Sequence, residues 1–178
     1  MYSKQDVAAF QRVGEFLCWF SMLETNLDET VINLLGLEPI AGRLLLTYVP
    51  FGKKCDFLNE LIGLGEVGLS AEEKAQAKDK LGSIRKLADT RNVIAHSFFA
   101  AQEGGVKFLK AEKKMRADTS RTIDEESFQK HRTDIADLWG WVAEISHRIK
   151  MKMTEKQIAQ ALADRLANEI SEPFSKPH

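Results

Sequence analysis

Apolar residues recur at alternating steps of three and four from the start of this 178-residue chain as far as Leu34. The positions that share this spacing are Phe10, Val13, Leu17, Phe20, Leu27, Val31 and Leu34. This is the period of a long α-helix that packs one apolar stripe against a partner. Ser3 can cap the start of the helix, and Gly36 can end it. A chain that opens in this way is expected to form a helical bundle, because other elements must cover the stripe.

The rest of the chain carries further helix signals and one hairpin signal. Pro39 suits the first turn of a second helix, and a third is expected through Cys55 and Leu58. Capping boxes, which mark the starts of helices, occur at Ser70, Thr122 and Thr154. The helix after Thr154 is either a new one or a continuation of the helix that starts after Thr122. A Gln-Glu-Gly-Gly turn at 102–105 separates two short apolar runs, 98–101 and 106–109, and predicts a small β-hairpin.

The expected fold is therefore all-α: an antiparallel bundle of about five to six helices with a small β-hairpin between the fourth and fifth. Residues 1–170 are expected to form one helical domain and residues 171–178 a flexible C-terminal tail. No stretch approaches the ~20 apolar residues of a membrane-spanning helix, and the N-terminus does not resemble a secretory signal. Cys18 and Cys55 stand apart from other metal ligands and are expected to be buried, reduced thiols. We therefore expect a cytoplasmic protein without a metal or other cofactor.

A charged and polar segment, Arg91-Asn92-Val93-Ile94-Ala95-His96, lies near the end of the fourth predicted helix. At about 100° per residue, Asn92 and His96 are about 40° apart on that helix, and the long Arg91 side chain can curl toward them. Arginine binds phosphate oxygens through a two-pronged fork, and histidine exchanges protons near neutral pH. Together they can act on a phosphodiester. The alternative is a pair of cations that interacts with the dipole at the helix end.

This segment resembles the signature of the HEPN superfamily, in which an arginine and a histidine late in a long helix are separated by four to six residues, the first of them polar. Here four residues separate Arg91 from His96, and Asn92 is the polar one. The opening helix with Ser21-Met-Leu-Glu24, the hairpin after the motif and the capped helix after Thr122 also match the usual order of elements. The resemblance spans roughly residues 10–150 and leaves the segment after Thr154 unexplained.

The resemblance implies a metal-independent endoribonuclease of a toxin or defence system, acting as a homodimer in which two motifs share one cleft, with a possible antitoxin protein as partner. Carried onto this chain, His96 is the general acid or base, Arg91 binds phosphate, Asn92 positions the substrate or the histidine, and Glu24 holds Arg91 or His96. Two alternatives stay open. One is a non-catalytic HEPN-like module that binds a nucleotide or a protein partner, and the other is a structural helical dimer with Glu24, Arg91 and His96 in a buried polar network.

Glu24 occupies a position of the apolar stripe, between Phe20 and Leu27. Burying a carboxylate is costly unless it is paired or hydrogen-bonded. Periodicity alone favours a helix that drifts until Glu24 reaches solvent at the edge of the bundle. A pairing with the motif would satisfy both partners. We therefore predict a Glu24 oxygen ~2.7–3.2 Å from Arg91, Asn92 or His96, directly or through one water, and hence adjacent first and fourth helices.

The net charge of the chain, −1, disfavours a protein that coats nucleic acid without specificity. The segment 106–121 is locally basic, with six positive and two negative residues. The residues expected to bind RNA there are Lys107, Lys110, Lys113, Lys114 and Arg116. A solvated loop without function is the alternative interpretation of this segment.

Overall fold

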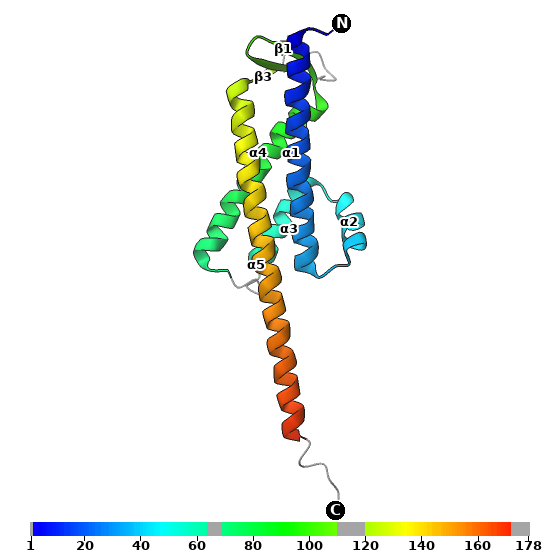
Figure 1. Cartoon of the computed structure of the whole chain (residues 1–178), viewed down its shortest axis with the longest axis vertical. Coiled ribbons are helices and arrows are strands. Elements are labelled where there is room, and N and C mark those ends of the chain that lie inside the picture. The colour runs from blue at the N-terminus through cyan, green and yellow to red at the C-terminus, as the bar shows by residue number, and fades with distance from the viewer. Residues whose placement is uncertain (1, 64–68, 110–119, 172–178) are drawn as a thin grey trace, which may run out of the picture.

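The computed structural model describes residues 2–63, 69–109 and 120–171; within the last helix, the side chains of 149, 152–153 and 155–171 lie outside this description. Helices and strands follow in the order α1 (Lys4–Leu35), α2 (Pro39–Thr47), α3 (Phe51–Gly63), α4 (Ala71–His96), β1 (Phe98–Gln102), β2 (Gly105–Leu109), β3 (Ser120–Asp124) and α5 (Glu125–Ser171). The helices α1 and α5 lie side by side, α3 and α4 pack behind them, and the small sheet closes one end (Figure 1). The predicted, mainly helical fold is confirmed.

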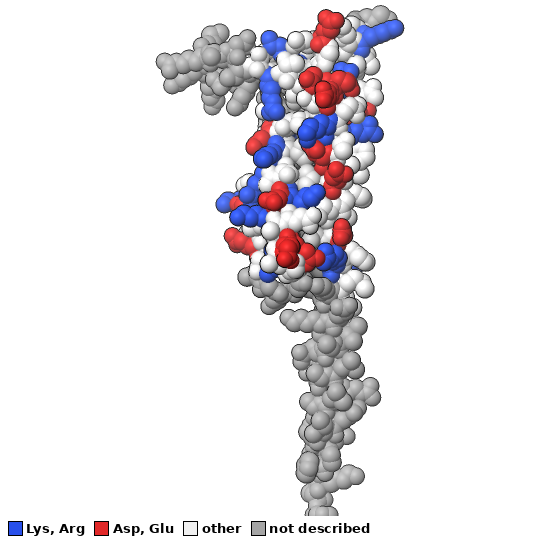
Figure 2. Space-filling model, turned by 90° about the vertical axis from the view of Figure 1, so that its left-hand side faces the viewer, with Lys and Arg blue, Asp and Glu red and all other residues white. Residues whose placement is uncertain are grey.

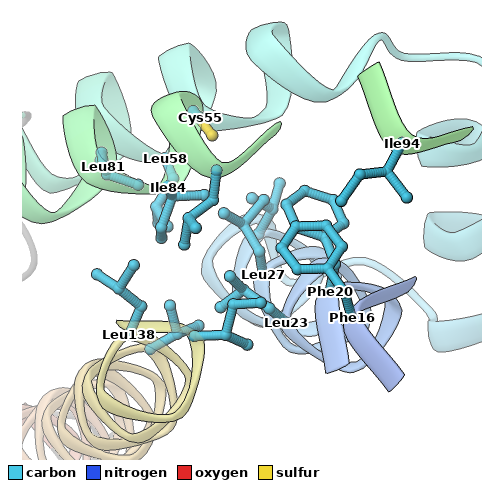
Figure 3. Close-up of a cluster of buried hydrophobic side chains, with 14 of the residues drawn as sticks. Phe16, Phe20, Leu23, Leu27, Cys55, Leu58, Leu81, Ile84, Ile94 and Leu138 are labelled. Carbon is cyan, nitrogen blue, oxygen red and sulfur yellow. The ribbon is translucent and has the colours of Figure 1, made fainter. Parts of the chain in front are cut away.

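The core lies where α1, α3, α4 and α5 meet, and it corrects the predicted stripe of α1. The buried apolar positions of α1 are Ala9, Val13, Phe16, Phe20, Leu23, Leu27, Val31 and Ile32. Figure 3 shows several of them facing Leu58, Ile84 and Leu138 from the three other helices. The alternation of three and four was right, but Phe16 and Leu23 belong to the stripe, whereas Leu17 and Glu24 flank it and are only half-buried. Four predicted positions, Val13, Phe20, Leu27 and Val31, are buried, so the prediction was right in part. Phe16 and Leu23 are buried as well because three partner helices cover a face of α1 wider than one narrow line.

The hairpin is confirmed, and a third strand extends it. The strands β1 and β2 pair antiparallel across a turn in which Gly104 has φ 74, a value that favours glycine. The third strand, β3, was missed because Thr122 was taken as a helix cap. Thr122 instead pairs with Lys107 in the sheet, and Asp124 accepts a 2.8 Å hydrogen bond from the amide of Ser127 as α5 begins.

The capping box at Thr154 does not begin a separate helix. The Thr154 hydroxyl donates to the carbonyl of Lys150 (2.9 Å) within α5, so the helix continues, as the sequence left open. In Figure 1 the C-terminal part of α5 extends beyond the other helices. Residues 172–178, most of the predicted tail, lie outside the described residues.

The two cysteines differ. Cys55 is buried, and burial raises the pKa of its thiol to about 11, so it stays protonated at neutral pH. Cys18 is exposed, which contradicts the expectation that both are buried. Cys18 lies two positions from Phe16 and from Phe20, and two residues turn an α-helix by about 200°, away from the buried stripe. Among the described residues, no helix has the length and apolar character needed to cross a membrane.

Ser70 is predicted to contribute about 1 kcal/mol to stability as the N-cap of α4. Its hydroxyl accepts from the amide of Glu73, and the Glu73 carboxylate accepts from the amide of Ser70 in return. Replacing Ser70 with alanine leaves the Glu73 amide without this acceptor. Urea unfolding of Ser70→Ala and of Ser83→Ala, an exposed position inside the same helix, measures the difference. Equal stability of the two variants would contradict a capping role.

Candidate functional site

The Arg91–His96 motif occupies the last two turns of α4, directly before β1. Ile94 is 3% exposed and points into the core near Phe16 and Phe20 (Figure 3), which fixes the rotation of the helix end. At about 100° per residue, an inward Ile94 places Asn92 and His96 on the opposite, outer side and Arg91 on the flank. Asn92 and His96 are indeed exposed, and Arg91 is half-buried. The prediction that Asn92 and His96 lie on the same side of the helix is therefore confirmed.

The guanidinium of Arg91 has no carboxylate partner among the described residues. Its Nη1 donates a long hydrogen bond, 3.3 Å, to the side-chain oxygen of the neighbouring Asn92. Because this partner is a neutral amide, most of the five N–H donors of the Arg91 guanidinium remain able to bind an anion. His96 is the basic residue of the last helical turn, the position that the alternative interpretation, a cation at the negative end of the helix dipole, requires.

Glu24 makes no direct hydrogen bond or ion pair with Arg91, Asn92 or His96, so the predicted direct pairing was wrong. The ammonium of Lys54 on α3 donates to Glu24 Oε1 (3.1 Å) and to Asp28 Oδ2 (2.8 Å). The helices α1 and α4 do contact each other, as predicted. The Glu24 carboxylate does have a cationic partner, but α3 supplies it instead of α4. Lys54 was missed although it lies four residues before Leu58 and eight before Ile62, on the buried stripe of α3, and that spacing was the signal that could have revealed it.

Two half-buried carboxylates and one buried ammonium make up this cluster, in which the lysine side chain is only 5% exposed. Burial raises the pKa of Asp28, and the hydrogen bond and positive charge of Lys54 oppose that shift. Burial by itself lowers the pKa of Lys54, but hydrogen bonds and charges from Asp28 and Glu24 raise it overall, so the ammonium stays charged. The cluster joins α1 to α3 and does not contribute a group to the motif. Glu24 is therefore a structural residue here.

The predicted RNA-binding residues are described only in part. Lys107 lies on β2, half-buried, and pairs with Ala100 of β1, the strand that begins two residues after His96. Its neighbours Val106 and Phe108 are buried, so Lys107 points to the other face of the sheet. Lys110, Lys113, Lys114 and Arg116 lie outside the described residues.

A groove of about 650 Å³ between α4 and α5 ends beside the motif: its lining includes Asp89 and Thr90, directly before Arg91, but no residue of the motif itself. Its lining includes Lys80, Lys86 and Lys130, but also Asp79 and Asp134. On the face shown in Figure 2, positive and negative side chains are interspersed among the described residues. The described residues on this side therefore do not form the single-sign surface that steers a polyanion.

The third alternative, a buried network of Glu24, Arg91 and His96, is wrong for the single chain, because His96 is exposed and Glu24 pairs with Lys54. Within the described part of the chain, no group of three or more histidine, cysteine, aspartate or glutamate side chains could hold a metal ion. What remains is an accessible arginine, amide and imidazole at one helix end. Comparison with known proteins adds no family to this picture: no family model, no curated protein and no solved structure matches the chain.

Proposed function

We propose that the chain is a HEPN-like, metal-independent endoribonuclease whose reacting groups are Arg91, Asn92 and His96. One observation carries the proposal: the Arg91 guanidinium, without a carboxylate partner among the described residues, lies on the same helix end as the exposed imidazole of His96. Glu24 is no longer part of the proposed site.

The proposed reaction is attack of a ribose 2′-hydroxyl on the adjacent phosphate, which expels the 5′-oxygen and leaves a 2′,3′-cyclic phosphate. The attack requires a base that takes the hydroxyl proton and an acid that protonates the leaving oxygen. Arg91 binds the phosphate oxygens, whose charge grows in the transition state. Each motif supplies one histidine, so a second copy of the chain supplies the second proton-transfer group in the proposed homodimer.

Wild-type protein is predicted to cleave a labelled RNA oligonucleotide in excess EDTA and to leave 2′,3′-cyclic phosphate ends, because the nucleophile comes from the substrate. The matched substrate control is the same oligonucleotide with every 2′-hydroxyl replaced by hydrogen, which should stay intact. Electrophoresis and mass spectrometry of the products measure both. Cleavage that stops with EDTA, or that proceeds on the deoxy substrate, contradicts this chemistry. Binding without cleavage would favour the non-catalytic module.

A further inference from the structure

The small sheet at the end of the bundle has an inner and an outer face (Figure 1). The helix α1 contacts β1, α5 contacts β3, and the inner face carries three buried side chains, Val106, Phe108 and Ile123. Side chains alternate between the two faces of a strand, so Phe98, Ala100 and Lys107 lie on the outer face. Phe98 and Ala100 are exposed there, so this face is open to solvent.

Phe98 is an aromatic side chain that the outer face presents to solvent. It is 73% exposed, whereas Phe108 is 1% exposed. Phe99 packs on the rings of Phe10 and Phe108, with 5.3 and 6.1 Å between ring centroids. The rings of Phe99 and Phe108 therefore hold the sheet against the bundle. Phe98 takes no part in these ring contacts, and both sides of the strand are accounted for without it.

Phe98 also lies beside the proposed reacting group. One residue, Ser97, separates it from His96, and the backbone of Ser97 is extended (φ −114, ψ 150). The Cα atoms of His96 and Phe98 are therefore at most ~7 Å apart. Both side chains are exposed. A strand whose phosphate lies at His96 thus brings a neighbouring base within reach of the Phe98 ring.

The polar groups of the outer face suit a phosphate backbone. Lys107 lies on the middle strand, two positions from Leu109, which pairs with Phe98, and it has no carboxylate partner among the described residues. Asp124 lies at the far end of the sheet and accepts from the amide of Ser127 at 2.8 Å. Stacking on an aromatic ring and a nearby cation are the two contacts by which proteins hold single-stranded nucleic acid. A protein partner would favour a wider apolar patch, but only Leu109, 37% exposed, adjoins Phe98.

We propose that the outer face of the sheet binds the RNA strand next to the reacting phosphate, with Phe98 stacked on a base and Lys107 beside the backbone. The choice of RNA as the occupant rests on the proposed function. Both are positioning residues, because neither transfers a proton in the proposed reaction. Binding at this face and cleavage at His96 can fail separately.

The test measures binding of a single-stranded RNA oligonucleotide whose 2′-hydroxyls are all methylated, so that it cannot be cleaved. Phe98→Ala should weaken this binding about 5–150-fold, the effect of losing one base–aromatic stack, as measured by fluorescence anisotropy. Phe98→Tyr keeps a ring and should bind like the wild type. The matched control is Tyr48→Ala, an 81% exposed aromatic on α2, which should also bind like the wild type. Circular dichroism should be unchanged in all three variants, because both positions are exposed.

A second oligonucleotide set, each member lacking one base, identifies the stack. Loss of the stacked base should weaken binding by the wild type and have no further effect on Phe98→Ala. Equal binding by the wild type and Phe98→Ala, an equal loss in Tyr48→Ala, or no binding by the wild type overturns the inference. Cleavage is measured separately on unmodified RNA. Binding that depends on Phe98 without any cleavage contradicts the proposed function and leaves this binding face in place.

Discussion

Replacement of His96 with alanine should lower the rate of RNA cleavage by about 10²–10⁴-fold while leaving the fold intact. The size of the effect follows from losing the proposed proton-transfer group. The fold should survive because His96 is exposed and is the last residue of α4. Cleavage of a labelled oligonucleotide under single-turnover conditions gives the rate, and thermal unfolding gives the stability.

The matched control is His147→Ala, since His147 is likewise exposed and lies on α5, outside the motif. Arg91→Ala should also lose activity, chiefly through weaker phosphate binding and transition-state stabilisation. If His96→Ala and His147→Ala cleave equally fast, the motif is not the site of reaction.

Replacement of Lys54 with methionine should destabilise the protein by about 3 kcal/mol, the low end of the range for breaking a buried ion pair. The reason is that the carboxylates of Glu24 and Asp28 would face each other without their shared cation. Both retain some access to water, 31% and 20% of their side chains, which keeps the loss from being larger. Urea unfolding at pH 7 measures it. The matched control is Lys53→Met, because Lys53 is 71% exposed and its 3.5 Å pair with Asp56 should contribute less than ~1 kcal/mol.

The Lys54 variant also has a predicted pH dependence. Without the ammonium, burial and the negative charge of Glu24 should raise the pKa of Asp28 further above its unfolded value, because Lys54 no longer opposes that shift. The native state then binds more protons than the unfolded state in that window, so stability decreases as pH rises through it. The penalty of Lys54→Met should therefore be smaller at pH 4 than at pH 7. A penalty that is constant between these pH values, or equal to that of Lys53→Met, argues against the buried cluster.

Features that depend on local spacing could be predicted from the sequence, and those that depend on how helices turn toward each other could not. The hairpin followed from two apolar runs around Gly104, and the common side of Asn92 and His96 followed from four residues of helix. The strand β3 was missed because Thr122 to Glu125 fits a helix cap equally well, and only pairing with β2 decides between them.

Glu24 illustrates the same limit in the site. Its need for a cation was correctly inferred from the cost of burying a carboxylate. The identity of the cation depends on the rotation of α3, which turns Lys54 inward, and on the rotation of α4, which turns Arg91 to the flank. Neither rotation is determined by the residues beside Glu24. Energetic arguments therefore show that a buried charge needs a partner, and packing decides which residue becomes that partner.

Chemical rescue tests whether the imidazole of His96 takes part in the reaction. His96→Gly removes the ring and leaves space for a free imidazole at the exposed end of α4. We expect this variant to be inactive in buffer and to regain RNA cleavage as the imidazole concentration rises, with 2′,3′-cyclic phosphate products. His147→Gly should be active without added imidazole and should not respond to it. Full activity of His96→Gly without imidazole, or no rescue at any concentration while the wild type cleaves, would contradict a catalytic role for His96.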